Sequence, residues 1–247
     1  MSVKIAIAGA AGRMGQQLIA ATEANAGAIF HAGFDLTGGF EASLDSAFKG
    51  ADVVIDFTLP DATGNIMAAA REAGASYVLG TTGHSDAQLK LIKSESINLP
   101  ILQAANYSLG VNVLMGLVNQ AAKALSKFDI EILELHHSKK IDAPSGTALA
   151  LGHSAALARG AQLNQMATYS RVGEPGARPE GEIGFATLRG GDNPGEHTVM
   201  FVGDGERVEL THRALDRSIF AKGAVAAAVW MKGKKPGLYG MEDILGF

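Results

Sequence analysis

One stretch decides the fold: Val3-Lys-Ile-Ala-Ile-Ala-Gly-Ala-Ala-Gly-Arg-Met-Gly15. It begins with a short run of β-branched and small apolar residues, which predicts a β-strand that ends at Gly9. Residues 13–26 then have the apolar spacing of a helix. Glycines between a first strand and a first helix allow a tight turn and let a pyrophosphate approach the helix N-terminus. The stretch therefore predicts a dinucleotide-binding unit, although its GxxGxxG spacing is a weak signal when taken alone.

Strands and helices alternate through the rest of the first half of the chain. The predicted strands are 29–35, 52–58, 77–82 and 100–106, and the predicted helices are 60–73 and 85–96. The strand at 52–58 is nearly all apolar, as expected of a parallel strand that is covered on both faces. This alternation predicts an α/β fold with a Rossmann-type, doubly wound parallel sheet over residues 1–107.

After residue 107 the pattern changes. A helix is predicted at 110–126, and strands are predicted at 128–135, 183–189, 197–202 and 207–211. This order predicts a second domain of α+β type at 108–216, with a mixed or antiparallel sheet and helices on one face. An Ala- and Val-rich helix at 218–232 follows, and the segment 217–247 is expected to complete the first, dinucleotide-binding domain.

The composition limits the classes of function. The 247 residues have a net charge of −4 and are 47% hydrophobic and 19% charged, so nothing points to a nucleic-acid or membrane partner. There is no cysteine, which excludes disulfides, thiolate metal sites and a cysteine nucleophile. The N-terminus lacks the order of a signal peptide, and no apolar run has the length of a membrane span. We therefore expect a cytoplasmic protein.

A second stretch carries the chemistry: Glu134-Leu-His-His-Ser-Lys-Lys-Ile-Asp-Ala-Pro-Ser-Gly-Thr-Ala148. It joins a predicted strand end to a predicted helix start, so the two adjacent imidazoles diverge and one of them can face a cleft. Lys140 is close enough in sequence to reach the same cleft. Gly146 and Thr147 stand at the helix start, where backbone N–H groups favour an anion. Cations, an imidazole and an anion site together predict a small, acidic substrate.

Plainer explanations of each part stay open. A histidine at a strand end is often structural, and the lysines could belong to a solvated turn. Asp142 or Ser145 could serve only as the helix cap, with Pro144 in the first turn. Residues 172–184 are rich in glycine and proline and predict a mobile surface loop, for which a role as a lid has no specific support.

Other polar residues fall where a cofactor would bind. Asp35 ends the second predicted strand, where a carboxylate accepts hydrogen bonds from the adenine ribose hydroxyls. The loops after the fourth and fifth strands lie at the carboxyl edge of the sheet, where their groups could hold the nicotinamide and its ribose. The predicted cofactor-binding residues are Gly9, Ala10, Ala11, Gly12, Arg13, Met14, Asp35, Gly80, Thr81, Thr82, Ala104, Ala105, Asn106 and Tyr107.

Taken together, the motifs resemble the dihydrodipicolinate reductase family of the bacterial diaminopimelate and lysine pathway. The resemblance covers nearly the whole chain, and the stretch from Glu134 to Ala148 is its most specific part. The other matching motifs, in chain order, are Gly9-Ala-Ala-Gly-Arg-Met-Gly15, Asp56-Phe-Thr58, Gly80-Thr-Thr-Gly83, Ala105-Asn-Tyr-Ser-Leu-Gly-Val-Asn112, Gly184-Phe-Ala-Thr-Leu-Arg-Gly-Gly-Asp192 and Gly195-Glu-His-Thr198.

The resemblance implies an NAD(P)H-dependent oxidoreductase that transfers a hydride to a cyclic dicarboxylate, 4-hydroxy-tetrahydrodipicolinate, with loss of the 4-hydroxyl as water. By the family pattern His136 is the acid/base residue, Lys140 is a proton donor and His137 contacts the substrate, while Gly146 and Thr147 bind a carboxylate. A lysine beside a dianion is expected to stay protonated, so its firmer role is electrostatic. The family also implies a homotetramer joined through the second domain, which makes 108–216 a substrate-binding and oligomerisation domain.

Two departures from the family pattern bear on the cofactor, which is NADH, NADPH or both. The segment between Asp35 and Asp52 is shorter than in many members, which should trim the adenine side of the sheet. Asp35 and Leu36 also stand where many members have a Glu-Arg pair, so an expected contact to a 2′-phosphate is missing. We predict that NADH is used at least as well as NADPH.

Two other functions stay open. A different Rossmann dehydrogenase acting on a small anionic substrate would share the fold but would not explain the stretch 134–148 as a unit. A non-catalytic NAD(H)-binding sensor would keep the glycine loop and Asp35 without needing His136 and Lys140. No metal is predicted, because adjacent histidines suit joint ligation poorly. Both His136 and a water remain candidates for delivering the proton.

Overall fold

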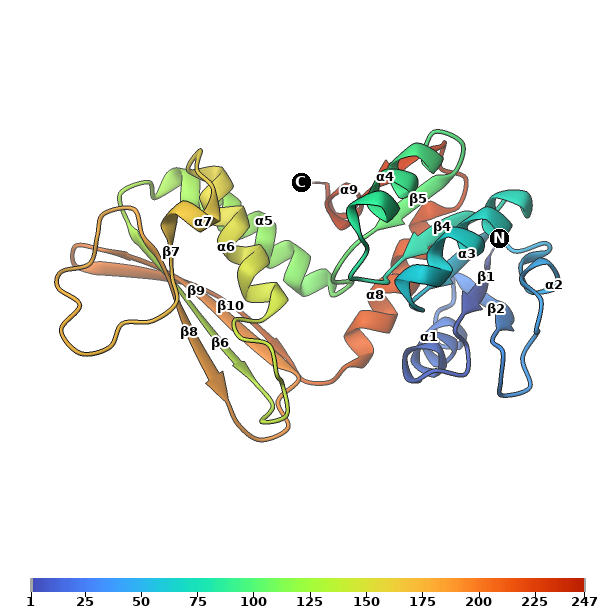
Figure 1. Cartoon of the computed structure of the whole chain (residues 1–247), viewed down its shortest axis with the longest axis horizontal. Helices are drawn as coiled ribbons and strands as arrows, with labels where there is room; N and C mark the ends of the chain where they lie inside the picture. The colour runs from blue at the N-terminus through green and yellow to red at the C-terminus, as the bar shows by residue number, and fades with distance from the viewer. Residues whose placement is uncertain (1, 247) are drawn as a thin grey trace. The chain divides into compact units, whose positions relative to one another are not determined.

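The chain folds into two units in the computed structural model, which describes residues 2–246. Unit 1 combines residues 1–109 with 218–247, and unit 2 comprises residues 110–217. Figure 1 shows the elements of both units in chain order. The separate roles predicted for the two domains, dinucleotide binding and substrate binding, stay predictions.

Unit 1 contains a six-stranded sheet in the order β11-β5-β4-β3-β1-β2, and all of its strand pairs are parallel. This arrangement confirms the predicted Rossmann-type sheet. Its strands are β1 (Val3–Ala8), β2 (Ala28–Phe34), β3 (Val53–Asp56), β4 (Ser76–Leu79), β5 (Pro100–Gln103) and β11 (Gly237–Tyr239). Its helices are α1 (Arg13–Glu23), α2 (Leu44–Phe48), α3 (Pro60–Glu72), α4 (Asp86–Glu95), α8 (Ser218–Met231) and α9 (Met241–Leu245).

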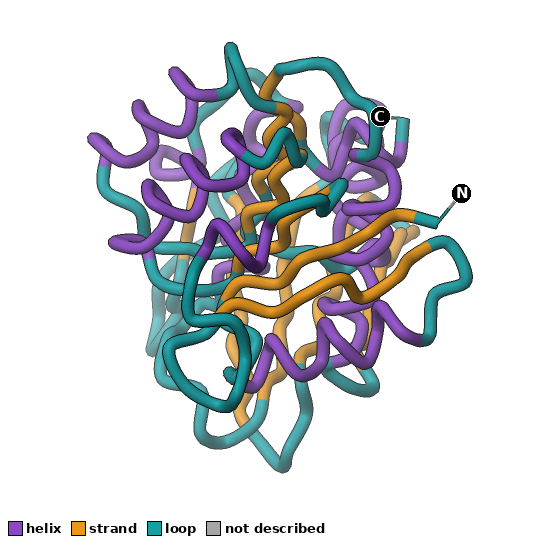
Figure 2. The backbone as a smooth tube through the Cα atoms, turned by 90° about the vertical axis from the view of Figure 1, so that its right-hand side faces the viewer, coloured by secondary structure: helices purple, strands orange, loops and turns teal. Residues whose placement is uncertain are grey.

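Helices cover both faces of this sheet, as Figure 2 shows. Successive strand residues point to opposite faces, so each strand contributes to two cores. Ile5 and Ile7 of β1 pack with α1 and α8, whereas Ala6 and Ala8 pack on the side of α2, α3 and α4. Every residue of β3 and β4 is buried, which explains why these strands are apolar apart from Asp56 and Ser76.

The short elements of unit 1 were not predicted from the sequence. The helices α2 and α9 each have 5 residues and β11 has 3, too few to show a period in the sequence. The helix α8 was predicted at 218–232, which is one residue longer at its C-terminal end than the helix in the structure. It lies close to β5 and the loop after it, because a Cβ at Gly223 would come within 1.7 Å of the Tyr107 carbonyl oxygen.

Unit 2 contains a five-stranded mixed sheet in the order β10-β9-β6-β8-β7. The strand β6 runs antiparallel to β9 and parallel to β8, so the prediction of a mixed sheet is confirmed. Its strands are β6 (Asp129–His136), β7 (Ala167–Thr168), β8 (Ile183–Arg189), β9 (Gly195–Gly203) and β10 (Glu206–Ala214), and its helices are α5 (Leu109–Ala124), α6 (Gly146–Ala158) and α7 (Leu163–Met166).

One face of this sheet packs against α5 and α6, as expected. Ile130 and Ile132 of β6 lie in that core together with Val199 and Phe201 of β9. The alternation continues along β6, so the buried residues that follow on the same face are Glu134 and His136. The apolar core is thus replaced by polar side chains at the carboxyl end of β6.

The start of α6 settles which residue caps this helix. Ser145 is the N-cap, and its hydroxyl accepts a hydrogen bond from the Ala148 N–H at 3.1 Å. Asp142 is not the cap, and Pro144 precedes the cap instead of occupying the first turn. Within residues 2–246, no helix combines the length and the apolar character that a bilayer span requires.

Candidate active site

The glycine loop has the geometry of a pyrophosphate cradle. Gly9 adopts φ +76°, which favours glycine, and a Cβ at Gly15 would lie 2.2 Å from the Gly9 carbonyl oxygen. Gly12 is the N-cap of α1 and provides no side-chain hydrogen bond to the first turn. The first N–H groups of the helix therefore have no side-chain cap, as an anion site at a helix N-terminus requires.

Asp35 follows β2 and is tied to the glycine loop. Its Oδ2 accepts a hydrogen bond from the Ala11 N–H at 3.0 Å, and its Oδ1 accepts from the Thr37 N–H and hydroxyl, both at 3.2 Å. The next residue, Leu36, is 81% exposed and has an apolar side chain, so position 36 provides no cation beside Asp35. This arrangement fits an adenine ribose with free hydroxyls, and the described residues of unit 1 therefore fit a dinucleotide.

A buried carboxylate supports the carboxyl edge of the sheet in unit 1. Asp56, the last residue of β3, accepts hydrogen bonds from the Thr58 N–H and hydroxyl at 2.8 and 2.7 Å. It also accepts from the hydroxyls of Thr81 and Tyr77. A Cβ at Gly9 would lie 2.9 Å from Thr58 Cγ2, so the turn that Asp56 holds lies against the glycine loop.

The predicted cofactor residues divide into two groups by exposure. Ala10 and Tyr107 are buried, and the Tyr107 hydroxyl donates to the carbonyls of Leu79 and Leu102, so any cofactor contact of these two would use the backbone. Thr81 is buried on Asp56. The residues that are at least partly exposed are Gly9, Ala11, Gly12, Arg13, Met14, Asp35, Gly80, Thr82, Ala104, Ala105 and Asn106.

In unit 2 a second buried carboxylate collects the polar groups around His136. Glu134 Oε2 accepts from His136 Nδ1, and the same oxygen accepts from an Arg189 guanidinium nitrogen at 3.1 Å. Its Oε1 accepts from the Ser145 N–H at 3.0 Å and from the Thr187 hydroxyl at 3.2 Å. One side chain thus joins β6, β8 and the start of α6.

His197 of β9 extends this cluster. Its Nε2 lies 3.0 Å from the Ser145 hydroxyl, and its ring meets the His136 ring edge-on at 5.1 Å between centroids. Gly146, the first residue of α6, has no heavy atom within 4 Å of the position of a Cβ. The cluster therefore lies next to an open helix start, where an anion can approach the first N–H groups.

The remaining predicted site residues lie on the loop after β6. Lys140 pairs with Asp142 through a 2.8 Å contact between Nζ and Oδ1. His137 accepts a 3.0 Å hydrogen bond at Nε2 from Arg217, because a guanidinium can only donate. The two adjacent imidazoles thus diverge, as predicted: His136 is buried, and His137 is partly exposed.

Charges and burial shift the protonation equilibria of this cluster. Burial lowers the pKa of His136 below its usual value, and the nearby Glu134 carboxylate offsets part of that shift. Burial raises the pKa of Glu134, but hydrogen bonds from Arg189, Ser145 and His136 outweigh it, so the net shift is downward. Burial, helped by His136, lowers the pKa of His197 to about 4. Near neutral pH the carboxylate is ionised and His197 is neutral.

The cluster also has to be tested as a metal site. Glu134, His136 and His197 offer ligand atoms within 4.8 Å of one another. The oxygens of Glu134, however, already accept hydrogen bonds, two of them from the Arg189 guanidinium, whose positive charge opposes a bound cation. These donors fit a hydrogen-bond network better than a metal centre, and the prediction of no metal stays a prediction.

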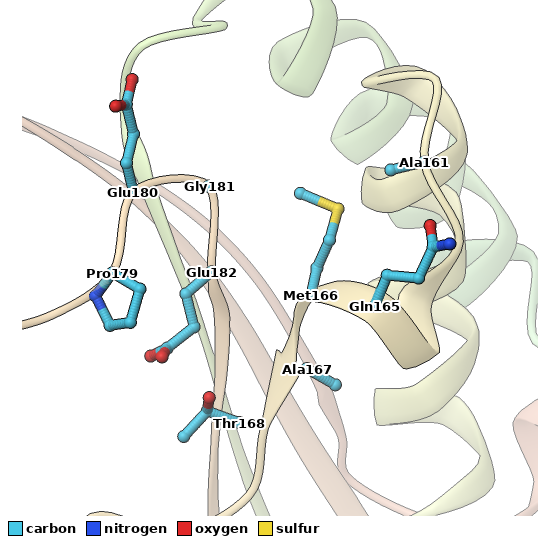
Figure 3. A pocket seen from close by; sticks show the side chains of 9 residues that line it. All are labelled: Ala161, Gln165, Met166, Ala167, Thr168, Pro179, Glu180, Gly181 and Glu182. Carbon is cyan, nitrogen blue, oxygen red and sulfur yellow. The ribbon is translucent and has the colours of Figure 1, made fainter. Parts of the chain in front are cut away.

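A cavity elsewhere in unit 2 does not fit an acidic substrate. It has a volume of about 300 Å³ and lies between α7 and the turn at Gly181. Figure 3 shows Met166 projecting into it, with the acidic side chains of Glu180 and Glu182 on the opposite wall. Glu182 pairs with Arg171, and the Glu180 carboxylate adds a negative charge to the wall that disfavours a dicarboxylate.

The loop predicted at 172–184 is anchored at two points. Arg171 pairs with Glu131 and Glu182, and Arg178 pairs with Asp129 and Glu131. The charges of this segment therefore bind it to the first half of β6, at the opposite end of the strand from His136. A role of this loop as a lid still has no specific support.

Four members of the polar cluster were not predicted from the sequence: Thr187, Arg189, His197 and Ser145. A signal for three of them existed in the alternation of the strands. Thr187 and Arg189 lie on the same face of β8 as the core residue Phe185, because alternate residues of a strand share a face. His197 lies on the same face of β9 as Val199. Polar residues at the core-facing positions of a strand indicate either that the strand was predicted in the wrong register or that they form a functional cluster.

The glycine cradle with Asp35, in one chain with a buried imidazole and carboxylate beside an anion-binding helix start, defines an NAD(P)H-dependent oxidoreductase of Rossmann type. Comparison with known proteins narrows this class. Models of the dihydrodipicolinate reductase N-terminus and C-terminus match residues 3–107 and 110–245, respectively. The chain belongs to the dihydrodipicolinate reductase family.

Individual relatives agree with this assignment. The chain is 50% identical to the 4-hydroxy-tetrahydrodipicolinate reductase of Caulobacter vibrioides over 99% of its length and 98% of the relative. It is 47% identical to that of Alkalilimnicola ehrlichii over the full length of both chains. A dipicolinate-bound dihydrodipicolinate reductase from a Paenisporosarcina species superposes with a TM-score of 0.81 at 25% identity, covering 99% of this chain and 100% of that one.

Proposed function

We propose that the protein reduces 4-hydroxy-tetrahydrodipicolinate to tetrahydrodipicolinate with NADH or NADPH, in diaminopimelate and lysine biosynthesis. The observation that carries the proposal is the cluster in which Glu134 binds both His136 and the Ser145 N–H at the start of α6. Glu134 thus holds both a proton-transfer group and an anion site, and this combination suits a reaction on a carboxylate-bearing ring. A location in the cytoplasm remains part of the prediction.

The reaction consumes one hydride and one proton and releases the 4-hydroxyl as water. When bound at the glycine loop and Asp35, the nicotinamide cofactor supplies the hydride. The protein has to hold the dianionic substrate and provide the proton. We assign the first task to the start of α6 and the second to the groups around His136.

Dicarboxylate binding is assigned to Gly146 and Thr147 with support from nearby cations. A substrate carboxylate at their N–H groups would benefit from the positive end of the α6 dipole. Lys140 lies on the adjoining loop and pairs with Asp142, a surface contact that is weak enough to exchange for a substrate carboxylate. His137, with Arg217 donating to it, adds a polar contact on the same loop.

Proton transfer is assigned to His136, with Lys140 as an electrostatic partner and proton donor. An imidazole exchanges protons near neutral pH, which suits a general acid. Its pKa is lowered by burial, and a bound dianion would raise it again by Coulomb attraction. His136 would therefore hold its proton best when the substrate is in place.

We propose that NADH is used at least as well as NADPH. The support is the Asp35 carboxylate, fixed by the Ala11 N–H and by Thr37, and the apolar side chain of Leu36 next to it. A carboxylate repels a 2′-phosphate. A kcat/KM that favours NADPH by about tenfold or more would contradict this preference.

We further propose a homotetramer that assembles through the open face of the unit 2 sheet. This face lies opposite α5 and α6 and carries apolar side chains, of which Leu188 is 49% and Val202 38% exposed. Leu133, Leu135 and Met200 lie on the same face of the sheet. Sedimentation equilibrium should give a tetramer for the wild type and smaller species for the Leu188→Asp/Val202→Asp double variant.

The activity is tested by following the oxidation of NADH and of NADPH with substrate prepared freshly from pyruvate and aspartate semialdehyde. Turnover with loss of the reduced-nicotinamide absorbance supports the proposed reaction, and the two rates test the cofactor preference. Binding of NADH without turnover would contradict the proposal and favour the non-catalytic sensor.

A further inference from the structure

We infer that Glu134 is a positioning residue that holds the proton-transfer imidazole of His136 and the anion-binding start of α6 in one fixed arrangement. The inference rests on the proposed function, because it assigns the roles of His136 and α6 from there. It concerns a residue that touches neither substrate nor cofactor in that proposal and acts through its neighbours.

The first observation is that Glu134 is enclosed and fully bonded. Its side chain is 1% exposed, on the face of β6 that continues the core of unit 2. A buried carboxylate is stable only when it is paired and hydrogen-bonded. Arg189 meets this need, because its two terminal nitrogens donate to both carboxylate oxygens at 3.1 and 3.2 Å.

The second observation concerns the tautomer of His136. An ionised carboxylate can only accept, so the ring nitrogen that faces Glu134, Nδ1, must carry a hydrogen. The neutral ring then has an unprotonated Nε2, and the charged ring has a donor there. The backbone leaves room at this end, because a Cβ at Gly195 would come within 2.8 Å of Nε2. Glu134 thus fixes which nitrogen is available for proton transfer.

The third observation is the link to the helix start. The Ser145 N–H donates to Glu134 Oε1, while the Ser145 hydroxyl caps α6 at the Ala148 N–H. The N–H of Ser145 is therefore used inside the protein. The N–H of Gly146, the first residue of α6, comes next along the chain at the helix start to which the proposed function assigns a substrate carboxylate.

Several charged groups face His136, and the effect of Glu134 has to be separated from theirs. Lys140 from the loop after β6 and Arg189 from β8 both lower the pKa of His136, whereas Glu134 raises it. His197 of β9 stacks edge-on against the ring, and His212 of β10 lies near His197. Among these groups, Glu134 is the one whose charge favours the protonated imidazole.

The test is the Glu134→Gln variant, compared with Glu131→Gln as a matched control. Glu131 lies on the same strand but on the opposite face, where it pairs with Arg171. The Glu134→Gln variant should lower kcat by about tenfold, raise KM for the dicarboxylate, and move the alkaline decline of kcat to lower pH. The control variant should keep the wild-type pH profile.

The shift of the pH profile distinguishes positioning from a merely structural effect. A Glu134→Gln enzyme that loses activity equally at every pH, with the alkaline decline unmoved, would overturn the inference. A shift equal to that of the control would overturn it as well.

A measurement on the wild type covers the case in which Glu134→Gln does not fold. Nitrogen-15 NMR of the histidine side chains, with His136 assigned by its loss in His136→Gln, reports which ring nitrogen carries the hydrogen. A hydrogen on Nδ1 supports the inference, and a hydrogen on Nε2 overturns it. This result does not depend on turnover, so it stands apart from a failure of the proposed function in the NADH assay.

Discussion

The two units each bury one carboxylate among hydrogen-bond donors near the carboxyl end of a strand, and the donors differ in kind. Asp56 of unit 1 is 0% exposed and is bonded by hydroxyls and one backbone N–H. Glu134 of unit 2 is 1% exposed and is bonded by a guanidinium, an imidazole, a hydroxyl and one backbone N–H.

The difference shows how the same buried group can serve two purposes. Hydroxyl donors near Asp56 keep their protons across the physiological range, and burial with the nearby carboxylate raises the pKa of Tyr77 well above its usual value. The node of hydrogen bonds around Asp56 can therefore only hold backbone turns in place. The partners of Glu134 include titratable and charged groups. The hydrogen-bonded node around Glu134 therefore also sets a local electric field that acts on proton transfer.

The largest effect is expected from removing the carboxylate of Asp56. The Asp56→Ala variant leaves the buried donors of Tyr77 and Thr58 unpaired, at about 1–3 kcal/mol for each group. We expect a loss of about 4 kcal/mol in the free energy of unfolding, measured by urea denaturation, together with a higher KM for NADH. Asp45→Ala, at an exposed position in α2, should cost less than about 1 kcal/mol. A loss below about 1 kcal/mol for Asp56→Ala would remove the distinction between these positions.

Acid should open unit 2 before unit 1. The pKa of His197 is lowered to about 4 from a usual 6.5, so the folded state binds fewer protons than the unfolded state between these pH values. Stability therefore falls as the pH drops from 6.5 to 4, by on the order of 3 kcal/mol, and this contribution is fully present above pH 6.5. The pKa values of His136 and His212 are lowered too, which acts in the same direction.

Hydrogen exchange at pH 7 and pH 4.5, corrected for the intrinsic rate, measures this difference for each unit. The strands β6 and β9 should lose protection more than β1 and β3. The variant His197→Gln should reduce the loss in β9. Equal loss in both units would contradict the contrast between the two nodes.

Removing the imidazole of His136 should affect catalysis much more than stability. The variant His136→Gln should lower kcat by about 100-fold, equivalent to about 2.7 kcal/mol in the barrier, with a modest change in KM. His153→Gln, at an exposed position in α6, provides the control and should keep the wild-type kcat. An unchanged kcat for His136→Gln would leave a water as the proton donor.

The smallest effect is expected at the exposed ion pairs on the other face of β6. Arg171→Ala removes the contacts to Glu131 and Glu182 and should cost no more than about 1 kcal/mol, because such pairs are solvated. The loop 172–182 should become more sensitive to limited proteolysis, while kcat stays at its wild-type value. A large loss of kcat would give the loop a catalytic role after all.

The sequence predicted the parts of this molecule that are local along the chain. The strand, glycine loop and helix at 3–23 follow one another without a gap, and so do β6, the loop and α6. Local pattern and cap chemistry were therefore sufficient for the sheet of unit 1 and for the neighbourhood of His136, Gly146 and Thr147. Ser145 and Asp142 could not be separated as caps, because both residue types serve that purpose.

The parts that were missed depend on pairing between distant strands. Arg189 lies opposite His136, and Thr187 opposite Glu134, only because β8 pairs with β6 in that register, and His197 lies opposite Glu134 through β9. A shift by one residue would turn each of these side chains to the other face. The hydrogen bonds that define the nodes of Asp56 and Glu134 are therefore properties of the assembled sheets.

The last segment of the chain gives this architecture an order of assembly. Residues of α8 and α9 share one core with Val3, Ile5 and Ile7, and β11 forms an edge of the same sheet. During synthesis, residues 218–246 leave the ribosome after all of unit 2 has emerged. Unit 1 thus starts before unit 2 and is completed after it, so a nascent chain can close the core of unit 2 while β5 still lacks β11 and one face of the unit 1 sheet lacks the cover of α8.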